Sequence, residues 1–384
     1  MIDAIEPGVL APDEASPVQA EPDAIPAELL PTGRSYRSDR PRSVRTRTLD
    51  DRLTLLGAAA GSLAFSWLTY FQLLPLSGTL GFLVWWFVAF VVFYGVITAQ
   101  SQPWPIVKDR VMAAVVHCGA GIVGFGLLVT LVTTFVKGWP AYHHLNFFTH
   151  DMAGVKPTDS FDHGGILHAI VGSVEQVAIA VAIALPLGIG AGIYMNEVGG
   201  GFAKVVRTVV EAMTALPDLV AGLFIYTTLI IALGSERTGL AASLAIGITM
   251  LPIIARSSEV VLRVVPGGLR EAGQALGASQ WQTVRRVVLP TARPGLATAM
   301  ILGIARGIGE TAPVLIVSGA STFFNANPLA NTMNSLPLYT YFAVRSPEPN
   351  YITRGYGAAS VLLFVVLVLF VAVRRLARQR TAQR

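Results

Sequence analysis

An arginine and a glutamate lie one helical turn apart in the middle of a long apolar segment, at Arg306 and Glu310 within Leu296 to Val317. A charge at the centre of a membrane-spanning helix costs about 2.5–3.5 kcal/mol on insertion scales, so such residues normally face a protein interior or a water-filled route. A guanidinium offers a planar fork of hydrogen-bond donors to an oxyanion, and a carboxylate can hold that fork or accept a hydrogen bond. Together with Thr311, these residues are candidates to line a substrate pathway.

The same pair also has a purely structural interpretation. Because Arg306 and Glu310 are four residues apart, they can neutralise one another on one face of a helix and simply hold a helical bundle together. Two further acidic residues in apolar segments, Glu175 and Asp218, have no obvious partner in the sequence and are additional pathway candidates. The residue types alone leave both interpretations open.

A short polar stretch between two apolar segments, Glu271 to Pro290, is the second feature of interest. Ser279 followed three residues later by Gln282 is the signature of a capping box that starts a helix, and Gly277 supplies a bend before it. Three apolar residues then fall on one helix face: Trp281, Val284 and Val288. We expect Pro290 to end that helix. The pattern predicts a small helical hairpin outside the bilayer, where another protein can grip it.

The composition requires a membrane. Hydrophobic residues make up 53% of the 384 and charged residues only 13%, with a mean hydropathy of +0.58, which leaves too few polar groups to cover a water-soluble fold. A span needs about 20 apolar residues. Eight segments qualify, which predicts an all-α polytopic membrane protein with about eight transmembrane helices: Leu55 to Leu74, Leu80 to Ala99, Met112 to Val136, Ile166 to Met195, Met213 to Leu233, Leu240 to Ile254, Leu296 to Val317 and Tyr356 to Val373.

Basic residues cluster beside alternate spans and predict the orientation of the chain. The clusters precede the first span, follow the second, fourth and sixth, and follow the last, within residues 34–52, 108–110, 204–207, 256–293 and 374–384. Since Lys and Arg are retained on the cytoplasmic side, an even number of spans with both termini in the cytoplasm accounts for every cluster.

The hairpin residues resemble a known family. In the permease subunits of ATP-binding-cassette (ABC) importers, a cytoplasmic loop carries Glu-Ala-Ala, then Gly, then an aliphatic residue, one further residue, and Leu-Pro. The matching positions are Glu271, Ala272, Gly277, Val287, Leu289 and Pro290, with Gly273 in place of the second alanine. The resemblance covers roughly Met112 to Val373 and implies a six-helix ABC type-1 permease core behind an N-terminal two-helix extension.

A second set of residues narrows the resemblance. Arg306 and the run Gly309-Glu310-Thr311-Ala312-Pro313, with Leu336-Pro337 before the last span, are similar to the phosphate-importer permeases, and more to the PstA type of subunit than to the PstC type. Phosphate carries a hydroxyl at neutral pH and sulfate does not, so a carboxylate in the pathway favours phosphate. A separate binding protein can nevertheless set the specificity of an importer.

The resemblance also implies partners. We expect a second, PstC-like permease subunit, two cytoplasmic ATPase subunits and an external phosphate-binding protein, at the bacterial plasma (inner) membrane. The ATPase-coupling residues would be Glu271, Ala272, Gly277, Trp281, Leu289 and Pro290. Because the sequence holds no Gly-rich loop ending in Gly-Lys-Ser or Gly-Lys-Thr, we expect the partners to use the ATP and this chain to have no cofactor and no enzymatic activity of its own.

The expected organisation has four parts: a disordered cytoplasmic tail over residues 1–50, a two-helix extension over 51–105, a first core helix with an external loop over 106–165, and the permease domain over 166–376. The external loop holds four histidines whose spacing matches no compact ligand set, so we expect no metal site. The single cysteine, Cys118, leaves no disulfide framework.

Three other functions remain open at this point. The first is an ABC permease for another oxyanion, such as sulfate, molybdate or phosphonate. The second is an ion-coupled secondary carrier that uses Glu175, Asp218 or Glu310 for coupling, although no inverted pair of broken helices is recognisable. The third is a membrane sensor that transports nothing.

Overall fold

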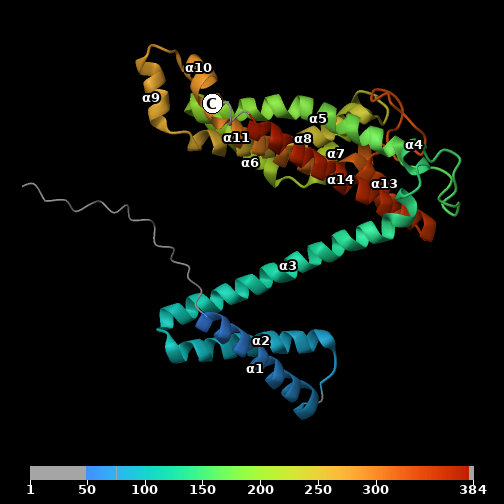
Figure 1. The fold of residues 1–384 in the computed structure, drawn as a ribbon. Coiled ribbons are helices and arrows are strands. Elements are labelled where there is room, and N and C mark those ends of the chain that lie inside the picture. The colour runs from blue at the N-terminus through green and yellow to red at the C-terminus, as the bar shows by residue number, and fades with distance from the viewer. Residues whose placement is uncertain (1–48, 75, 380–384) are drawn as a thin grey trace, which may run out of the picture. The chain divides into compact units, whose positions relative to one another are not determined.

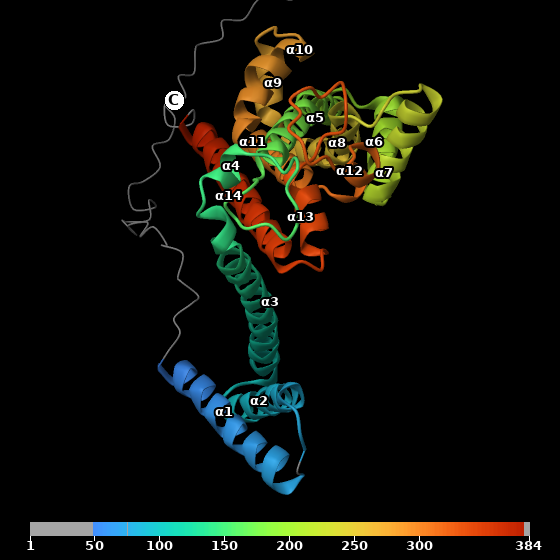
Figure 2. The same cartoon turned by 90° about the vertical axis from the view of Figure 1, so that its right-hand side faces the viewer.

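The computed structural model describes residues 49–74 and 76–379, and this part of the chain is built from helices joined by loops (Figures 1 and 2). Nearly all of the predicted tail over residues 1–50 falls outside it. Within the described residues, seven helices are long and apolar enough to cross a membrane, or eight if one sharply bent pair counts as a single span. The predicted all-α membrane fold is confirmed.

The helices form two compact units, Met1–Gly119 and Ala120–Arg384, and the division falls inside the long helix α3. In the first unit, the indole Nε1 of Trp86 donates to Ser62 Oγ at 3.2 Å across the helix pair, and Arg110 pairs with Asp51 at 2.6 Å. The elements of this unit are α1 (Leu49–Trp67), its π-helical continuation η2 (Leu68–Leu73), α2 (Thr79–Ser101) and the first part of α3 (Trp104–Tyr142).

The second unit contains the candidate residues. In it α5 and α8 lie side by side, α11 packs against α8, and α14 packs against α11 (Figure 1). Its elements after α3 are α4 (Asn146–Thr149), α5 (Leu167–Ile193), η3 (Tyr194–Val198), α6 (Gly200–Ala215), α7 (Asp218–Ile225), η4 (Tyr226–Ala232), α8 (Gly239–Val264), α9 (Gly267–Ala275), α10 (Gln280–Thr283), η5 (Val284–Val288), α11 (Leu289–Ile308), α12 (Ala312–Val317), α13 (Leu336–Val344) and α14 (Pro349–Gln379).

Small residues let α5 and α8 approach closely. Ala180 and Ala184 on α5 are fully buried in the same cluster as Met250 and Ile254 on α8. A Cβ atom added at Gly188 would lie 2.8 Å from the side chain of Ile254, so the close approach of the two helices depends on that glycine. The α5–α8 pair therefore forms the rigid centre of the second unit.

The fifth predicted span is bent rather than straight. The predicted helix Met213 to Leu233 is divided between α6 and the α7–η4 helix, whose axes differ by 104°. Leu216 and Pro217 join them in extended conformations, with ψ near 135° at both residues. A proline disfavours helical geometry at the residue before it, which explains why the helix breaks here. Because the helix breaks at Leu216 and Pro217, Asp218 is the first residue of α7.

The seventh predicted span is broken as well. Instead of one helix over Leu296 to Val317, α11 begins earlier, at Leu289, and ends at Ile308, and α12 begins at Ala312. Glu310 and Thr311 lie in the non-helical turn between them. Pro313 explains the break, because its ring removes a backbone donor and crowds the carbonyl four residues earlier. Glu310 therefore lies outside α11, and the periodicity of that helix does not set the position of its side chain.

Candidate functional site

Arg306 is at the centre of a charged cluster drawn from three segments. Its Nη2 atom donates to Oδ2 of Asp218 on α7, and its Nη1 atom lies 3.1 Å from Oε1 of Glu310 in the α11–α12 turn. The predicted meeting of Arg306 and Glu310 is present in the structure. Asp218 appeared in the sequence as an acid with no partner, and the structure shows that Arg306 is its partner. A lone acid directly after a helix-breaking proline was the signal available in the sequence.

The Arg306–Asp218 pair borders a cavity of about 250 Å³. The bend between α6 and α7 forms one wall and the middle of α8 forms the other, and the lining residues are Met213, Thr214, Leu216, Pro217, Asp218, Ala221, Ile248, Thr249, Pro252, Ile253 and Arg306. A single water needs only about 10–15 Å³ by the same kind of measure, so the space is large enough for a small ion. A guanidinium at the edge of such a cavity can bind an oxyanion through two parallel hydrogen bonds.

Two other pathway candidates lie elsewhere. Thr311 is half-buried beside Glu310 but does not line the cavity. Glu175 on α5 is half-buried too, is not among the lining residues, and has one carboxylate oxygen, Oε2, buried without a hydrogen-bond partner in the described part of the chain. Of the candidates read from the sequence, the structure therefore brings Arg306, Glu310 and Asp218 together.

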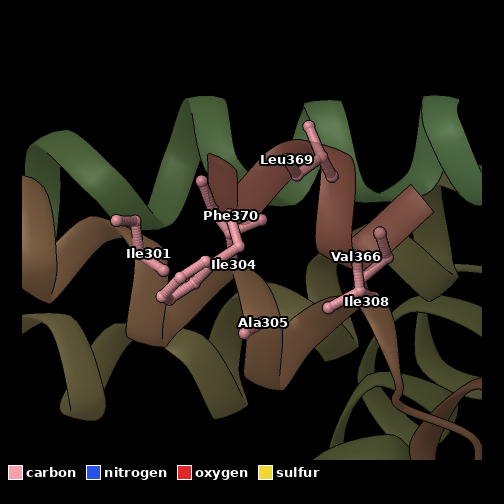
Figure 3. A pocket seen from close by; sticks show the side chains of 7 residues that line it. All are labelled: Ile301, Ile304, Ala305, Ile308, Val366, Leu369 and Phe370. Carbon is pink, nitrogen blue, oxygen red and sulfur yellow. The ribbon is translucent and has the colours of Figure 1, made fainter. Parts of the chain in front are cut away.

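The opposite face of α11 is entirely different (Figure 3). There α11 meets α14 along a narrow gap of about 10 Å³, and every lining side chain is apolar: Ile301, Ile304, Ala305, Ile308, Val366, Leu369 and Phe370. We call this contact the α11–α14 seam. The seam faces α14, whereas Arg306 lies on the side of α11 that faces α7 and α8.

The polar stretch after α8 forms the predicted hairpin, α9 followed by α10, at the end of the second unit away from α4 and α13 (Figure 1). Gly277 makes the turn with φ of +80°, a conformation that L-residues other than glycine rarely adopt. The capping box is present in both directions: the Ser279 amide donates to Gln282 Oε1 at 2.9 Å, and the Gln282 amide donates to Ser279 Oγ at 3.3 Å. The sequence pattern identified this turn correctly.

The surface of the hairpin is apolar at its tip. Leu276 is 89% exposed and Trp281 is 63% exposed, and Glu271 and Ala272 are exposed on α9. Gly273, the residue that replaces the usual second alanine, is buried, and a Cβ atom there would lie 3.2 Å from the Thr283 side chain. The exposed tip has the character of a surface that another protein covers.

One local prediction about the hairpin is wrong. Pro290 does not end the helix, because the chain runs from α10 through the π-helical turn η5 into α11. A π-turn directly before a proline loosens the backbone at the point where the ring would clash, so the helix continues. Of the three apolar residues expected on one helix face, Val284 and Val288 are almost fully buried, whereas the Trp281 indole is exposed.

A partly buried ion pair ties the hairpin to η3, which follows α5 directly. Arg270 on α9 donates from Nε and Nη2 to the Glu197 carboxylate at 3.0 and 2.7 Å, and also to the carbonyls of Leu262 and Val265 at the end of α8. Gln280 on α10 donates to the Glu197 carbonyl. The Glu197 hydrogen bond raises the pKa of the Arg270 guanidinium above its usual value. The hairpin is therefore bonded both to η3 and to the end of α8.

A family comparison identifies the architecture. Residues 184–381 match the family of the binding-protein-dependent transport system inner membrane component. The chain belongs to this family. The permease is 40% identical over 241 residues to the phosphate transport system permease protein PstA of Mycobacterium leprae, a match that covers 62% of this chain and 79% of that protein. It is 38% identical over 258 residues to PstA 1 of Mycobacterium tuberculosis, with 65% and 84% covered.

A solved structure supports the same fold. The permease matches a chain from the crystal structure of a bacterial ABC transporter involved in the import of the acidic polysaccharide alginate, with a TM-score of 0.50 and 15% identity, over 72% of this chain and 99% of that one. At that identity the likeness concerns the fold alone. It agrees with the predicted permease architecture.

Proposed function

We propose that the chain is the transmembrane permease subunit of an ATP-driven importer of inorganic phosphate. The observation that carries the proposal is Arg306 on a membrane-spanning helix, at the edge of a 250 Å³ cavity, in a chain whose relatives are named as phosphate transport permeases. The planar fork of Arg306 matches two oxygens of a tetrahedral oxyanion. The carboxylates of Asp218 and Glu310 accept hydrogen bonds, which favours an anion that carries a hydroxyl.

The energy would come from outside the chain. In the proposed complex, two cytoplasmic ATPase subunits cover the exposed tip at Leu276 and Trp281, with Glu271 and Ala272 beside it. A second, PstC-like permease subunit completes the membrane part, and an external phosphate-binding protein delivers the substrate. ATP is bound and hydrolysed by the ATPase subunits, and this chain needs no cofactor of its own. Both termini and the hairpin lie in the cytoplasm of a bacterial cell in this arrangement.

The contacts of the hairpin provide a route by which movement of the ATPase subunits would be transmitted to the substrate pathway. Arg270 and Gln280 fasten the hairpin to Glu197 on η3, directly after α5, and Arg270 also bonds the Leu262 carbonyl near the end of α8. The helix α8 carries Ile248, Thr249, Pro252 and Ile253 of the cavity wall. Closure of the ATPase pair would push the hairpin, shift α8 against the α6–α7 bend, and open the cavity to the other side of the membrane by alternating access.

Reconstitution of the complete complex tests the proposal. Proteoliposomes with the permease pair, the ATPase subunits and the binding protein should accumulate labelled phosphate when ATP is present on the ATPase side. Omission of ATP, or of the ATPase subunits, should abolish accumulation. Accumulation driven equally well by an ion gradient without ATP would contradict the proposal, and so would a complex that accumulates sulfate and excludes phosphate.

A further inference from the structure

Both outer nitrogens of Arg306 face a carboxylate in the structure. Nη2 bonds Asp218, and Nη1 faces Glu310 at 3.1 Å. An oxyanion binds an arginine through two adjacent donors, either Nη1 with Nη2 or Nε with Nη2, and both pairs include the Nη2 atom that Asp218 occupies. An oxyanion can therefore bind Arg306 through two donors only after Nη2 is released, while Glu310 can stay beside Nη1.

The two acids differ in their freedom to move. The Glu310 side chain is 4% exposed, in the turn between α11 and α12, where its own amide donates to the Gly307 carbonyl at 3.2 Å. The Asp218 side chain is 38% exposed, lines the cavity, and stands at the first residue of α7 beside the 104° bend. Asp218 can turn toward the cavity, whereas Glu310 is enclosed. Asp218 is thus the acid that yields.

The other polar groups of the cavity favour the same substrate class. The hydroxyl of Thr249 donates to the Ile246 carbonyl at 2.8 Å, and that of Thr214 donates to the Val210 carbonyl at 2.9 Å. With their protons used within their own helices, both hydroxyls offer lone pairs to the cavity. Among the lining side chains, Arg306 remains the donor, and Asp218, Thr214 and Thr249 are acceptors. An anion that brings its own proton matches this set.

We propose that Asp218 is an internal substitute for the substrate: it occupies Arg306 while the cavity is empty, yields to a protonated oxyanion, and then accepts the hydroxyl hydrogen bond of that anion. The choice of phosphate as the anion rests on the proposed function. Glu310 holds one side of the guanidinium throughout. A fully deprotonated anion such as sulfate would displace Asp218 and leave the acid facing it without a hydrogen bond, which opposes its binding.

The test measures anion binding to the purified complete complex without the phosphate-binding protein, so that the selectivity of that protein does not enter. Labelled phosphate and labelled sulfate are bound separately, and the ratio of their affinities is determined. In Asp218→Asn the preference for phosphate should fall by about tenfold or more, because an amide can donate to sulfate and no longer repels it. Asp218→Glu, which keeps the acceptor, should retain most of the preference.

The control is Glu236→Gln, an exposed acid between η4 and α8 that does not line the cavity, and it should leave the ratio unchanged. If the unmodified complex binds no phosphate and imports none with ATP, the proposed function fails. If it binds phosphate selectively and assembled Asp218→Asn keeps the full ratio, the proposal for Asp218 alone is overturned. Loss of the preference for phosphate over sulfate in assembled Asp218→Glu also overturns the proposal for Asp218. If Asp218→Asn does not assemble, the affinity ratio of Asp218→Glu is the test.

Discussion

The two faces of α11 differ in their chemistry and in the space beside them. Toward α14 it presents only apolar side chains, and the gap there is about 10 Å³ (Figure 3). Toward α7 and α8 it presents Arg306 at a cavity of about 250 Å³. The seam holds the helix in place through close packing, and the other face keeps a charge that packing alone could not accommodate. Substitutions on the two faces should therefore have different kinds of effect.

The largest effect is expected at the charged face. Arg306→Gln removes the cation and leaves Asp218 and Glu310 facing one another, and we expect ATP-driven phosphate uptake by the complete complex to fall by about 100-fold. Arg345→Gln, which changes an exposed arginine away from the cavity, is the matched control. Uptake that survives in an assembled Arg306→Gln complex would end the comparison, because Arg306 would then be an ordinary structural charge.

The Arg270–Glu197 pair tests whether the hairpin reaches the bundle by more than its covalent link to α11. Arg270→Gln leaves the Glu197 side chain, 6% exposed, without its ion-pair partner, which costs about 3 kcal/mol for a buried pair. Amide hydrogen exchange across α9 should become faster by a corresponding factor. Arg293→Gln, an exposed arginine on α11, should leave that exchange unchanged. Equal exchange in both variants would show that Arg270 does not attach the hairpin.

Gly277 lies in the turn of the hairpin, so a substitution there alters neither face of α11 and tests the hairpin alone. No atom lies within 4 Å of the position a Cβ would take, so a larger residue meets a backbone penalty and no clash. Gly277→Val should cost about 1–2 kcal/mol in the left-handed turn. We expect the complex to assemble but its phosphate-stimulated ATP hydrolysis to fall. Gly277→Asn, a residue that tolerates this conformation, should be nearly normal. Unchanged coupling in the valine variant would remove the hairpin from the mechanism.

The smallest effect is expected at the seam. Ile304→Val removes one methyl group from the apolar face of α11 and should lower the stability of the complex by about 1 kcal/mol. Its thermal unfolding midpoint in detergent should fall slightly, while the rate of phosphate uptake stays the same. A large loss of uptake without loss of stability would show that the seam takes part in transport, contrary to its apolar lining.

The sequence predicted local features well because their causes are local. The capping box at Ser279 and Gln282 needs only two residues at fixed spacing, and the pairing of Arg306 with Glu310 needs only four positions. The Asp218–Arg306 pair joins residues 88 apart in the chain and depends on the bend before Asp218. A pattern within one segment marks Asp218 as an acid after a helix-breaking proline, but it cannot name Arg306 as the partner.

Whether a given proline ends a helix could not be predicted from the sequence. Pro217 and Pro313 interrupt helices, whereas Pro252 and Pro294 lie inside α8 and α11, and Pro290 follows a π-turn without ending the helix. Each ring removes the same backbone donor, but neighbouring groups decide whether the freed carbonyl is satisfied and the helix continues. Those neighbours come from tertiary packing, which the sequence pattern does not contain.

The most direct measurement asks whether phosphate occupies the cavity beside Arg306. The chain has one cysteine, so Cys118→Ser gives a permease without thiols, in which Thr249→Cys labels the cavity wall and Ile304→Cys labels the seam, and labelling is read on the permease subunit alone. In the purified complex, a charged thiol reagent should modify the cysteine at position 249, and phosphate should slow that reaction while sulfate does not. The cysteine at position 304 should stay unreactive. Modification at 249 that proceeds at one rate with or without saturating phosphate would contradict a phosphate route through this cavity.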